Sequence, residues 1–560
     1  MCGIYGYIGT NNAYLEVLRG LYCLQYRGYD SCGIAYFDNG FKINKAIGTL
    51  DNLPKTVETN PNIAFGHTRW ATNGEVNLNN THPHVSFNNE FIVVHNGIIK
   101  NAEEIKTELI NKGISFYSDT DTEVIVNLLA SLSGKIEKRL EKLFSILKGS
   151  FSLIIGYKNG NLYALKKFSP LNILKADDGI YISSDVSSLK GGELYTLKDG
   201  DIIKISGNEL LSITDNKLEF KTHKNTIKDF SLGEFKHYML KEIYDTPNGI
   251  ENTYNYLKRK DLRKIFKHFS EFTFIGCGTA YHSCLIGEEF FSKISKYKVN
   301  SCLASNYSIN RRIKRKHLHI IVSQSGETAD CIKVAEQIKK YNGKILLITN
   351  EENCTMSRMA EYKIYTKAGK EVAVASTKTY CTQIFVFAYI TQLLKNKNFD
   401  LDVKTLIKNL KDYIENLNID NIVYNLKKID RLILIGKDID YLLLMEASLK
   451  IREIDYIFTI PMYSGELKHG TLSLIDKNSI VLALNTSNDK NKLDIVKNEI
   501  ESREGKIISI DDYINLNDIP DYLKPIYAII PFQLISYQLA LKRGYNPDMP
   551  RNLAKSVTVE

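Results

Sequence analysis

The sequence predicts an α+β region followed by two α/β domains, each built on a doubly wound parallel sheet. Residues 2–225 contain short β-like runs separated by Gly and Asn turns and interrupted by helix-period stretches, which is typical of an α+β fold. From about residue 250 the pattern becomes strand, loop and helix in repetition, which predicts parallel strands covered by helices. The second region also repeats itself, which indicates a duplicated domain.

The strands expected in the first region are short, apolar and bounded by turn residues. They cover residues 4–8, 33–37, 91–94 and 152–157, and Asn159-Gly160 marks the turn after the last of them. A helix is expected over 102–112, because its apolar residues recur at helical spacing and Gly113 can end it in a left-handed conformation.

Three pairs of strand-like segments carry the internal repeat. Each pair is offset by about 160 residues, in the same order: FTFIG (272–276) with LILIG (432–436), HIIVSQS (319–325) with SIVLALN (479–485), and KILLIT (344–349) with KIISID (506–511). The resulting boundaries are an N-terminal domain over 2–225, a linker over 226–249, α/β copies over 250–395 and 405–545, and a tail over 546–560.

The composition excludes several classes of protein. No run of about 18 apolar residues suggests a membrane span, and the N-terminus lacks the basic and apolar segments of a signal peptide. Nine scattered cysteines without paired zinc spacing fit a reducing cytoplasm. The net charge of +9 is spread along the chain, as on a solvated surface, so neither nucleic acid nor membrane is expected as a partner.

Cys2 is the first candidate for catalysis. Removal of Met1 would leave a thiol and an α-amino group on one residue. That amine has a pKa of about 7.7–8.0, so part of it is neutral near pH 7 and can take the thiol proton without a histidine. Because most cysteines are small buried hydrophobes, Cys2 by itself does not establish catalysis.

Four motifs follow Cys2 in the first region: RGYDS (27–31), HTRWAT (67–72), HNG (95–97) and SDTDTE (118–123). In this order they resemble the signatures of the class II, N-terminal-nucleophile glutamine amidotransferases. The resemblance implies an α+β N-terminal-nucleophile hydrolase sandwich that hydrolyses glutamine. It also implies no cofactor and no metal.

The residue types suit this chemistry, because an Arg can bind a carboxylate bidentately and amide N–H groups can stabilise an oxyanion. The resemblance assigns catalysis to Cys2, Asn96 and Gly97, and glutamine binding to Arg69, Thr72, Gly97 and Asp121.

Several residues of these motifs could instead have structural roles. Asp121 lies in a possible capping box that runs from Thr120 to Glu123, and Gly97 could be a turn glycine. His67 and His82 are expected to be structural, and Arg27 could be an ordinary salt-bridge partner. Asn73 stands where the family often has His.

A second group of candidate site residues lies in the C-terminal region. It begins where the strand HIIV (319–322) is followed by SQSGET (323–328) and a stretch with helical periodicity. Small hydroxyl residues and Gly at a helix N-terminus can surround an anion with N–H and O–H donors. No P-loop Lys is present, so a nucleoside triphosphate is not favoured. GCGTA (276–280) follows the preceding strand and supplies Thr279. A plain N-cap role for SQSGET is the alternative.

SQSGET resembles the fingerprint of the sugar isomerases. Four further segments narrow the likeness to the family of glutamine-dependent, glucosamine-6-phosphate-forming synthases: EVAVASTK (371–378), EASLKIREI (446–454), SGELKHG (464–470) and PRNLAKSVTVE (550–560). The resemblance implies a cytoplasmic homodimer that uses glutamine and fructose 6-phosphate in the first step of amino-sugar synthesis.

The same resemblance assigns roles in the second region. The phosphate would be held by Thr279, Ser323, Gln324, Ser325 and Thr328, and the sugar hydroxyls would face Val374, Ala375 and Ser376. Lys555 would form a Schiff base with C2, Glu453 would move the proton between C1 and C2, and His469 of the partner would assist ring opening. Lys450, on the same helical face as Glu453, would tune its charge or relay protons.

Trp70 is the only Trp, and by resemblance it gates an ammonia tunnel; a packed aromatic is the alternative. Ala280 replaces a Ser, Asn306 replaces a Glu and Arg452 replaces a Lys, which predicts changed affinity rather than a changed reaction. Two other functions stay open: a fructosyl-amine deglycase of the same fold, and a non-catalytic sugar-phosphate sensor. A phosphoribosyl-amine-forming enzyme is disfavoured, because its pyrophosphate loop is missing.

Overall fold

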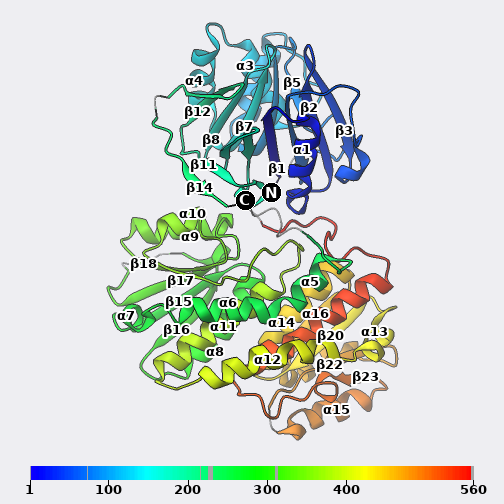
Figure 1. Cartoon of the computed structure of the whole chain (residues 1–560). Helices are drawn as coiled ribbons and strands as arrows, with labels where there is room; N and C mark the ends of the chain where they lie inside the picture. Colours follow the sequence, from blue (N-terminus) through cyan, green and yellow to red (C-terminus); the bar gives the residue numbers. More distant parts are fainter. Residues whose placement is uncertain are drawn as a thin grey trace. The chain divides into compact units, whose positions relative to one another are not determined.

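The computed structural model describes residues 2–71, 74–214, 216–224, 231–308, 313–487 and 489–556. They form two compact units that meet in the chain between Ser231 and Leu232, and each unit has its own core (Figure 1). Among the described residues, none of the helices has the length and hydrophobicity that a membrane span requires.

The N-terminal unit contains two antiparallel sheets. The first has the order β14-β11-β9-β10-β1-β4-β2-β3, and the second has the order β13-β12-β8-β7-β6-β5. The strands of the first sheet are β1 (Gly3–Gly9), β2 (Ser31–Phe37), β3 (Phe41–Ile47), β4 (Ile63–Arg69), β9 (Asn172–Ala176), β10 (Gly179–Ser183), β11 (Gly192–Thr196) and β14 (Lys221–His223). Those of the second are β5 (His84–Val85), β6 (Phe91–Ile99), β7 (Gly149–Tyr157), β8 (Leu162–Lys167), β12 (Ile202–Ser206) and β13 (Glu209–Ser212).

Side chains point alternately to the two faces of each strand, so each sheet packs on the other sheet with one face and on helices with the other. The unit therefore has four layers: helix, sheet, sheet and helix. Ile4 and Ile8 of β1 pack into the core between the two sheets, whereas Tyr5 and Tyr7 point to the other face and pack against α1. Three helices cover the outer face of the second sheet. The helices are α1 (Ala13–Tyr22), α2 (Ala102–Asn111), α3 (Asp121–Ser131) and α4 (Ile136–Ile146). The predicted sandwich is therefore confirmed.

The C-terminal unit contains two parallel sheets, with the orders β16-β15-β17-β18-β19 and β21-β20-β22-β23. The first sheet comprises β15 (Glu271–Gly276), β16 (Lys298–Leu303), β17 (His317–Val322), β18 (Lys344–Thr349) and β19 (Tyr362–Tyr365). The second comprises β20 (Arg431–Gly436), β21 (Phe458–Tyr463), β22 (Ile480–Ala483) and β23 (Lys506–Ser509).

The two sheets are copies of one arrangement. The three segment pairs found in the sequence occupy equivalent strands, β15 with β20, β17 with β22 and β18 with β23. The backbone repeats in detail as well: Gly278 before α8 has φ 52° and ψ −128°, and Asp438 before α14 has φ 51° and ψ −126°. Asp438 thus keeps a conformation that favours glycine.

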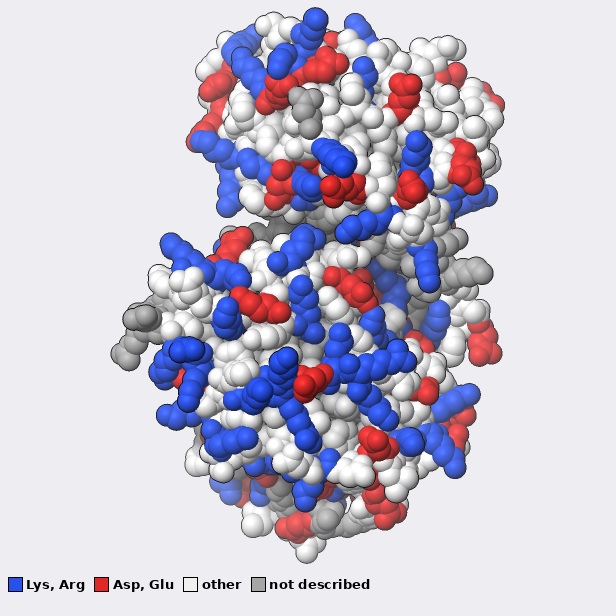
Figure 2. Space-filling view, turned by 60° about the vertical axis from the view of Figure 1, so that its left-hand side comes forward, with Lys and Arg blue, Asp and Glu red and all other residues white. Residues whose placement is uncertain are grey.

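Helices lie on both faces of these sheets, as expected for a doubly wound fold. One large core joins both sheets to α8, α11, α14 and α16, and smaller cores lie beneath α9 and α15. The helices are α5 (Tyr238–Tyr244), α6 (Thr246–Leu257), α7 (Leu262–Phe266), α8 (Thr279–Ser292), α9 (Ala329–Lys340), α10 (Thr355–Met359), α11 (Lys378–Leu394), α12 (Asp400–Asn416), α13 (Asp420–Leu426), α14 (Ile439–Asp455), α15 (Asp494–Glu501) and α16 (Lys524–Lys542). On the face shown in Figure 2, acidic side chains are interspersed among the Lys and Arg side chains.

Candidate functional site

Cys2 directly precedes β1 and lies beside the end of β4. Its Sγ accepts a hydrogen bond from the Trp70 N–H at 3.3 Å and lies 3.5 Å from the Trp70 carbonyl oxygen. Burial raises the pKa of the Cys2 thiol. The thiol therefore needs a nearby base to become a nucleophile.

The RGYDS and HTRWAT motifs are joined next to Cys2. The Asp30 carboxylate accepts from the Ala71 N–H at 2.8 Å, and the Asp30 N–H donates to the Arg69 carbonyl at 3.0 Å. A Cβ on Gly28 would lie 2.5 Å from the Arg69 carbonyl carbon, so the two segments touch through their backbones. Arg27 forms an ion pair with Asp185 at 3.2 Å.

Asn96 and Gly97 lie in β6, and Asn96 reaches Cys2. The Asn96 Nδ2 donates to the Cys2 carbonyl oxygen at 2.9 Å. Gly97 has φ +130°, and a Cβ there would lie 1.9 Å from the Ser150 carbonyl oxygen on β7. Gly97 is therefore a strand residue that must be glycine, and not a turn residue.

The cap of α3 is Thr120, which leaves Asp121 available for another role. The Thr120 hydroxyl accepts from the Glu123 N–H, as an N-cap does. Asp121 instead accepts from the Ile99 N–H at 2.9 Å and lies 3.6 Å from His95 Nδ1. Burial alone would raise the pKa of Asp121, but His95 and the Ile99 N–H hold it below its ordinary value. The carboxylate stays ionised and suits an ammonium ligand.

Arg69 is buried near these groups. Its guanidinium donates to the carbonyl oxygens of Glu75 at 3.2 Å and Gly74 at 3.5 Å. Burial lowers the pKa of Arg69, and the negative charges at Asp30 and Asp121 oppose that effect. Arg69 and Asp121 thus form a cation and an anion within electrostatic range, as the two charges of glutamine require. Thr72 and Asn73 lie outside the described residues.

A buried layer of histidines supports this site. His67 stacks on His82 with ring centroids 4.0 Å apart, and His67 Nε2 lies 3.0 Å from the carbonyl oxygen of His95. Burial lowers the pKa of His67 to about 3, and it lowers those of His82 and His84 as well. These three rings are therefore neutral. Those of His67 and His82 bond to the backbone of His95 in β6, which agrees with a structural role for both.

In the C-terminal unit the SQSGET loop joins β17 to α9. The hydroxyls of Ser323 and Thr328 lie 2.9 Å apart, and the Ser323 hydroxyl accepts from the Gly326 N–H at 3.1 Å. Gly326 has φ +64°, and a Cβ there would lie 2.1 Å from Cys354 Sγ. The loop is thus fixed with its hydroxyls and N–H groups gathered before a helix, an arrangement that suits an anion.

A buried charge network connects α8 to α14. Lys450 Nζ lies 2.7 Å from Glu453 Oε2 and 3.2 Å from Glu446 Oε1, and it donates to the Thr279 hydroxyl at 3.1 Å. Glu446 also accepts from Thr279 at 2.9 Å and lies 2.6 Å from His282 Nδ1. Thr279, proposed as a phosphate ligand, is therefore held next to the proposed proton-transfer pair.

The two ionised partners of Lys450 differ in their pKa. Burial raises the pKa of Glu453, although Lys450 and Lys555 oppose the effect. Burial alone would raise the pKa of Glu446, but Lys450 and His282 hold it below its ordinary value. Glu453 is thus the carboxylate of this network that is best suited to take up and release a proton.

The C-terminal tail contacts Glu371 and the SQSGET loop. Lys555 Nζ lies 2.5 Å from Glu371 Oε2, and the two side chains are 4% and 0% exposed. The next residue, Ser556, places its hydroxyl 2.9 Å from that of Ser325 in the SQSGET loop. The structure therefore brings the predicted Schiff-base lysine and the predicted phosphate loop together.

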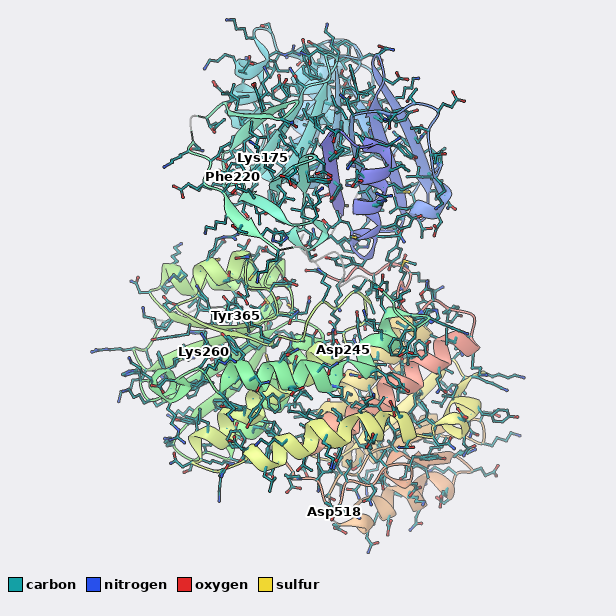
Figure 3. All side chains as sticks on the ribbon, viewed as in Figure 1. Lys175, Phe220, Asp245, Lys260, Tyr365 and Asp518 are labelled. Carbon is teal, nitrogen blue, oxygen red and sulfur yellow. The ribbon has the colours of Figure 1, made fainter. Side chains whose placement is uncertain are left out.

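The loop after Glu371 carries the predicted sugar contacts. Val374 and Ala375 are buried, and the Ser376 hydroxyl donates to Glu371 at 2.9 Å. Asp245, labelled in Figure 3, fixes the loop at its far end through an ion pair of 2.7 Å with Lys378.

Profiles for known domains match both units. The glutamine amidotransferase domain matches residues 67–191, and the SIS domain matches residues 269–392 and 425–515. The glutamine–fructose-6-phosphate aminotransferase (isomerizing) of Caldanaerobacter subterraneus subsp. tengcongensis is 36% identical over 620 aligned positions, and that of Bacillus subtilis is 35% identical over 608. Both alignments cover 100% of each chain. The chain belongs to the isomerizing glutamine–fructose-6-phosphate aminotransferase family.

A solved structure agrees with this family. The C-terminal domain of glucosamine-fructose-6-phosphate aminotransferase from Francisella tularensis is 30% identical to this chain, with a TM-score of 0.51. The alignment covers 57% of this chain and 100% of the solved domain.

Some predicted residues of this aminotransferase are not gathered at the site within one chain. His469 ends a short 3-10 helix, Ser464–His469, and is exposed. Asn306 and Arg452 are also exposed, and Ala280 is half-buried in the first turn of α8. No contact of the described residues gives Trp70 a particular role, apart from its backbone bonds to Cys2.

Sequence reasoning missed three buried glutamates in this family member. Glu446 and Glu371 lie in motifs that pointed to the site, but only their neighbours were assigned roles. Glu242 on α5 accepts from the N–H groups of Val372 and Ala373. The spacing of Glu446 four residues before Lys450 is a signal that could have identified the first of them.

Proposed function

We propose that this chain converts fructose 6-phosphate and glutamine into glucosamine 6-phosphate and glutamate, as the first step of amino-sugar synthesis. The observation that carries the proposal is the placement of Lys555 and Ser556, in a tail that most proteins would leave solvated, against Glu371 and the SQSGET loop. The names of the full-length relatives support the same reaction.

In the glutaminase half, the thiol of Cys2 attacks the side-chain amide of glutamine. The α-amino group freed by removal of Met1 accepts the thiol proton and passes it to the departing ammonia. Arg69, Thr72 and Asp121 hold the α-carboxylate and α-ammonium of the substrate. The second N–H of Asn96 and the backbone N–H of Gly97 stabilise the oxyanion, and one such donor contributes about 3–4 kcal/mol.

In the isomerase half, the phosphate binds Thr279, Ser323, Gln324, Ser325 and Thr328. His469, donated by the second subunit of a homodimer, assists opening of the sugar ring. Lys555 then forms a Schiff base at C2 with loss of water. Ammonia adds to C2, the bond from C2 to the Lys555 nitrogen breaks and releases the lysine, and Glu453 moves a proton between C1 and C2. Its raised pKa suits a group that must both accept and return a proton.

Free ammonia is mostly protonated in neutral water, so the reaction benefits from an internal passage. We assign its gate to Trp70, whose backbone N–H and carbonyl flank the Cys2 thiol. The exposed position of His469 within one chain supports its donation across a dimer interface. We assign the enzyme to the cytoplasm, where its nine free cysteines stay reduced.

Assays of wild type and Cys2→Ala test the proposal. With glutamine, the variant should release no glutamate and form no glucosamine 6-phosphate. With fructose 6-phosphate alone, its sugar isomerisation should equal that of the wild type. Glutamate release by Cys2→Ala at the normal rate would show that the nucleophile is misassigned. A wild type that forms no glucosamine 6-phosphate but splits a phosphorylated fructosyl-amine would favour a deglycase.

A further inference from the structure

The two proposed catalytic groups of the isomerase half, Lys555 and Glu453, form separate ion pairs. Lys555 Nζ lies 2.5 Å from Glu371, whereas Glu453 lies 2.7 Å from Lys450. The two carboxylates differ in protonation: burial would raise the pKa of Glu371, but Lys555 holds it at about 2, whereas burial raises that of Glu453. When two environments shift pKa values in opposite directions, the carboxylate with the lowered pKa, Glu371, stays an anion. The carboxylate with the raised pKa, Glu453, can carry a proton.

The surroundings of Glu371 fix it as an anion. Its Oε1 accepts from the N–H groups of Thr377 and Thr379, at 2.9 and 3.1 Å. Its Oε2 accepts from the Ser376 hydroxyl at 2.9 Å and from Lys555. All four donors point at the carboxylate, and the side chain is fully buried. A carboxylate with four donors has no need of a proton, and it cannot turn away from Lys555 without losing several bonds.

We propose that Glu371 is the counter-ion of the Schiff base at Lys555, which it keeps protonated and therefore open to attack by ammonia. This inference rests on the proposed function, because it requires the Schiff base. The step balances: Lys555 passes one ammonium proton to the C2 oxygen as its nitrogen attacks C2, a second nitrogen proton follows, and the C2–O bond breaks so that the oxygen leaves as water. The iminium keeps one N–H and the single positive charge, so Glu371 faces the same charge before and after the step.

The role of Glu371 follows from what ammonia requires. Ammonia adds to C2 when the nitrogen of the Schiff base carries a proton, because only the iminium draws electrons from that carbon. A carboxylate within about 4–6 Å stabilises the charged form of its partner by about 1–3 pKa units. Glu371 acts through Lys555 and does not touch C2, so it is a positioning residue.

Reductive trapping of the full-length enzyme tests the inference. Cyanoborohydride donates hydride to the iminium but not to the neutral imine, and it converts the Schiff base into a stable secondary amine. The enzyme is incubated with fructose 6-phosphate and cyanoborohydride across a pH series. Trypsin then cleaves after Arg551, and mass spectrometry measures the labelled fraction of the tail peptide that contains Lys555.

Glu371→Gln should lower the pH midpoint of labelling by about 1–3 units relative to wild type. Glu371→Asp keeps the negative charge but moves it farther from Lys555, so it should lower the pH midpoint by less than Glu371→Gln does. Asp245→Asn is the matched control, because it also neutralises a carboxylate that anchors this loop but pairs with Lys378 rather than Lys555, so its midpoint should equal that of the wild type. Glu371→Asp keeps the test decisive if Glu371→Gln does not fold.

Three outcomes would overturn the inference, and they separate it from the proposed function. Wild-type midpoints in both Glu371 variants would show that Glu371 is not the counter-ion, while the Schiff base stands. An equal fall in Asp245→Asn would mean that Glu371 only supports its loop. A wild-type enzyme that carries no label on Lys555 at any pH would overturn the Schiff base and the inference together.

Discussion

The hydroxyl of Ser556 lies 2.9 Å from that of Ser325, so the C-terminal tail contacts the loop that we propose for phosphate binding. The Ser325 oxygen also accepts from the Glu327 N–H at 3.2 Å. The proposed phosphate site and the tail therefore share one hydroxyl, and Ser556 is adjacent to Lys555. Under the proposed function, this contact would link binding of the sugar phosphate to the position of Lys555.

Ser325→Ala and Ser556→Ala should distinguish phosphate binding by Ser325 from the contact that Ser325 makes with the tail. Ser325→Ala loses a bond to a charged phosphate, worth about 1.5–3 kcal/mol, and should raise the KM for fructose 6-phosphate about 10- to 100-fold. Ser556→Ala loses a neutral bond of about 0.5–1.5 kcal/mol and should raise it less than about tenfold. Ser292→Ala, at an exposed helix end, is the control. Equal KM values for Ser325→Ala and the control would contradict the phosphate assignment.

Lys450→Met should shift the acid limb of sugar isomerisation to higher pH. Glu453 must be ionised to accept a proton, its pKa is already raised by burial, and Lys450 opposes that rise. Loss of the ammonium at 2.7 Å should raise the pKa of Glu453 further, by about 1–3 units. The profile of kcat/KM against pH measures the shift, and Lys450→Arg should restore most of the wild-type limb. An unmoved limb in Lys450→Met would mean that Glu453 is not the titrating base.

Glu242→Gln should make the C-terminal unit less sensitive to alkaline pH. Burial and the negative charge of Glu371 raise the pKa of Glu242 from 4.5 to about 8. The pKa of Glu242 is higher in the folded than in the unfolded state, so protonated Glu242 favours the folded state. This contribution to the free energy of unfolding is complete below about pH 4.5 and is lost as the pH rises toward 8. Each unit of pKa shift corresponds to about 1.4 kcal/mol, so the loss amounts to a few kcal/mol.

Urea unfolding, followed by circular dichroism at pH 5 and pH 8, checks the effect of Glu242→Gln. The wild-type midpoint should fall more between the two pH values than that of the variant. Glu251→Gln, on the exposed face of α6, is the matched control and should behave as the wild type does. Parallel falls in all three proteins would show that Glu242 is ionised at both pH values.

Gly97→Ala should abolish glutaminase activity and destabilise the N-terminal unit. Its Cβ would lie 1.9 Å from the Ser150 carbonyl oxygen, so β6 must shift away from β7 and the N–H of residue 97 must move. Loss of one oxyanion donor costs about 100- to 1000-fold in rate. Gly113→Ala is the control, because Gly113 also has a positive φ of +84° but a Cβ there meets no atom within 4 Å. The control should lose only about 1–2 kcal/mol of stability and keep its activity.

Glutamate release and the fluorescence of Trp70, the only Trp, follow activity and unfolding in the same samples of both glycine variants. Normal glutamate release by Gly97→Ala would exclude its N–H from the oxyanion site.

Local patterns and motifs were enough to predict the layout of the chain and its two reactions. Apolar period and turn residues are local properties, so they predicted an α+β region followed by parallel sheets, whereas the family resemblance supplied the sandwich. The repeated segments proved to be equivalent strands. The motifs of the family named Cys2, Asp121, Glu453 and Lys555, because the residue types that a reaction needs can be recognised without knowledge of their contacts.

The pairing of the buried charges could be learned only from the folded chain. Glu371 and Lys555 are 184 residues apart, and nothing in the periodicity of either segment reveals that they form an ion pair. It also separated the cap at Thr120 from the carboxylate of Asp121, which the sequence left as alternatives. The physical reason is that the protonation of a carboxylate depends on its burial and its charged neighbours, and folding alone brings those neighbours together.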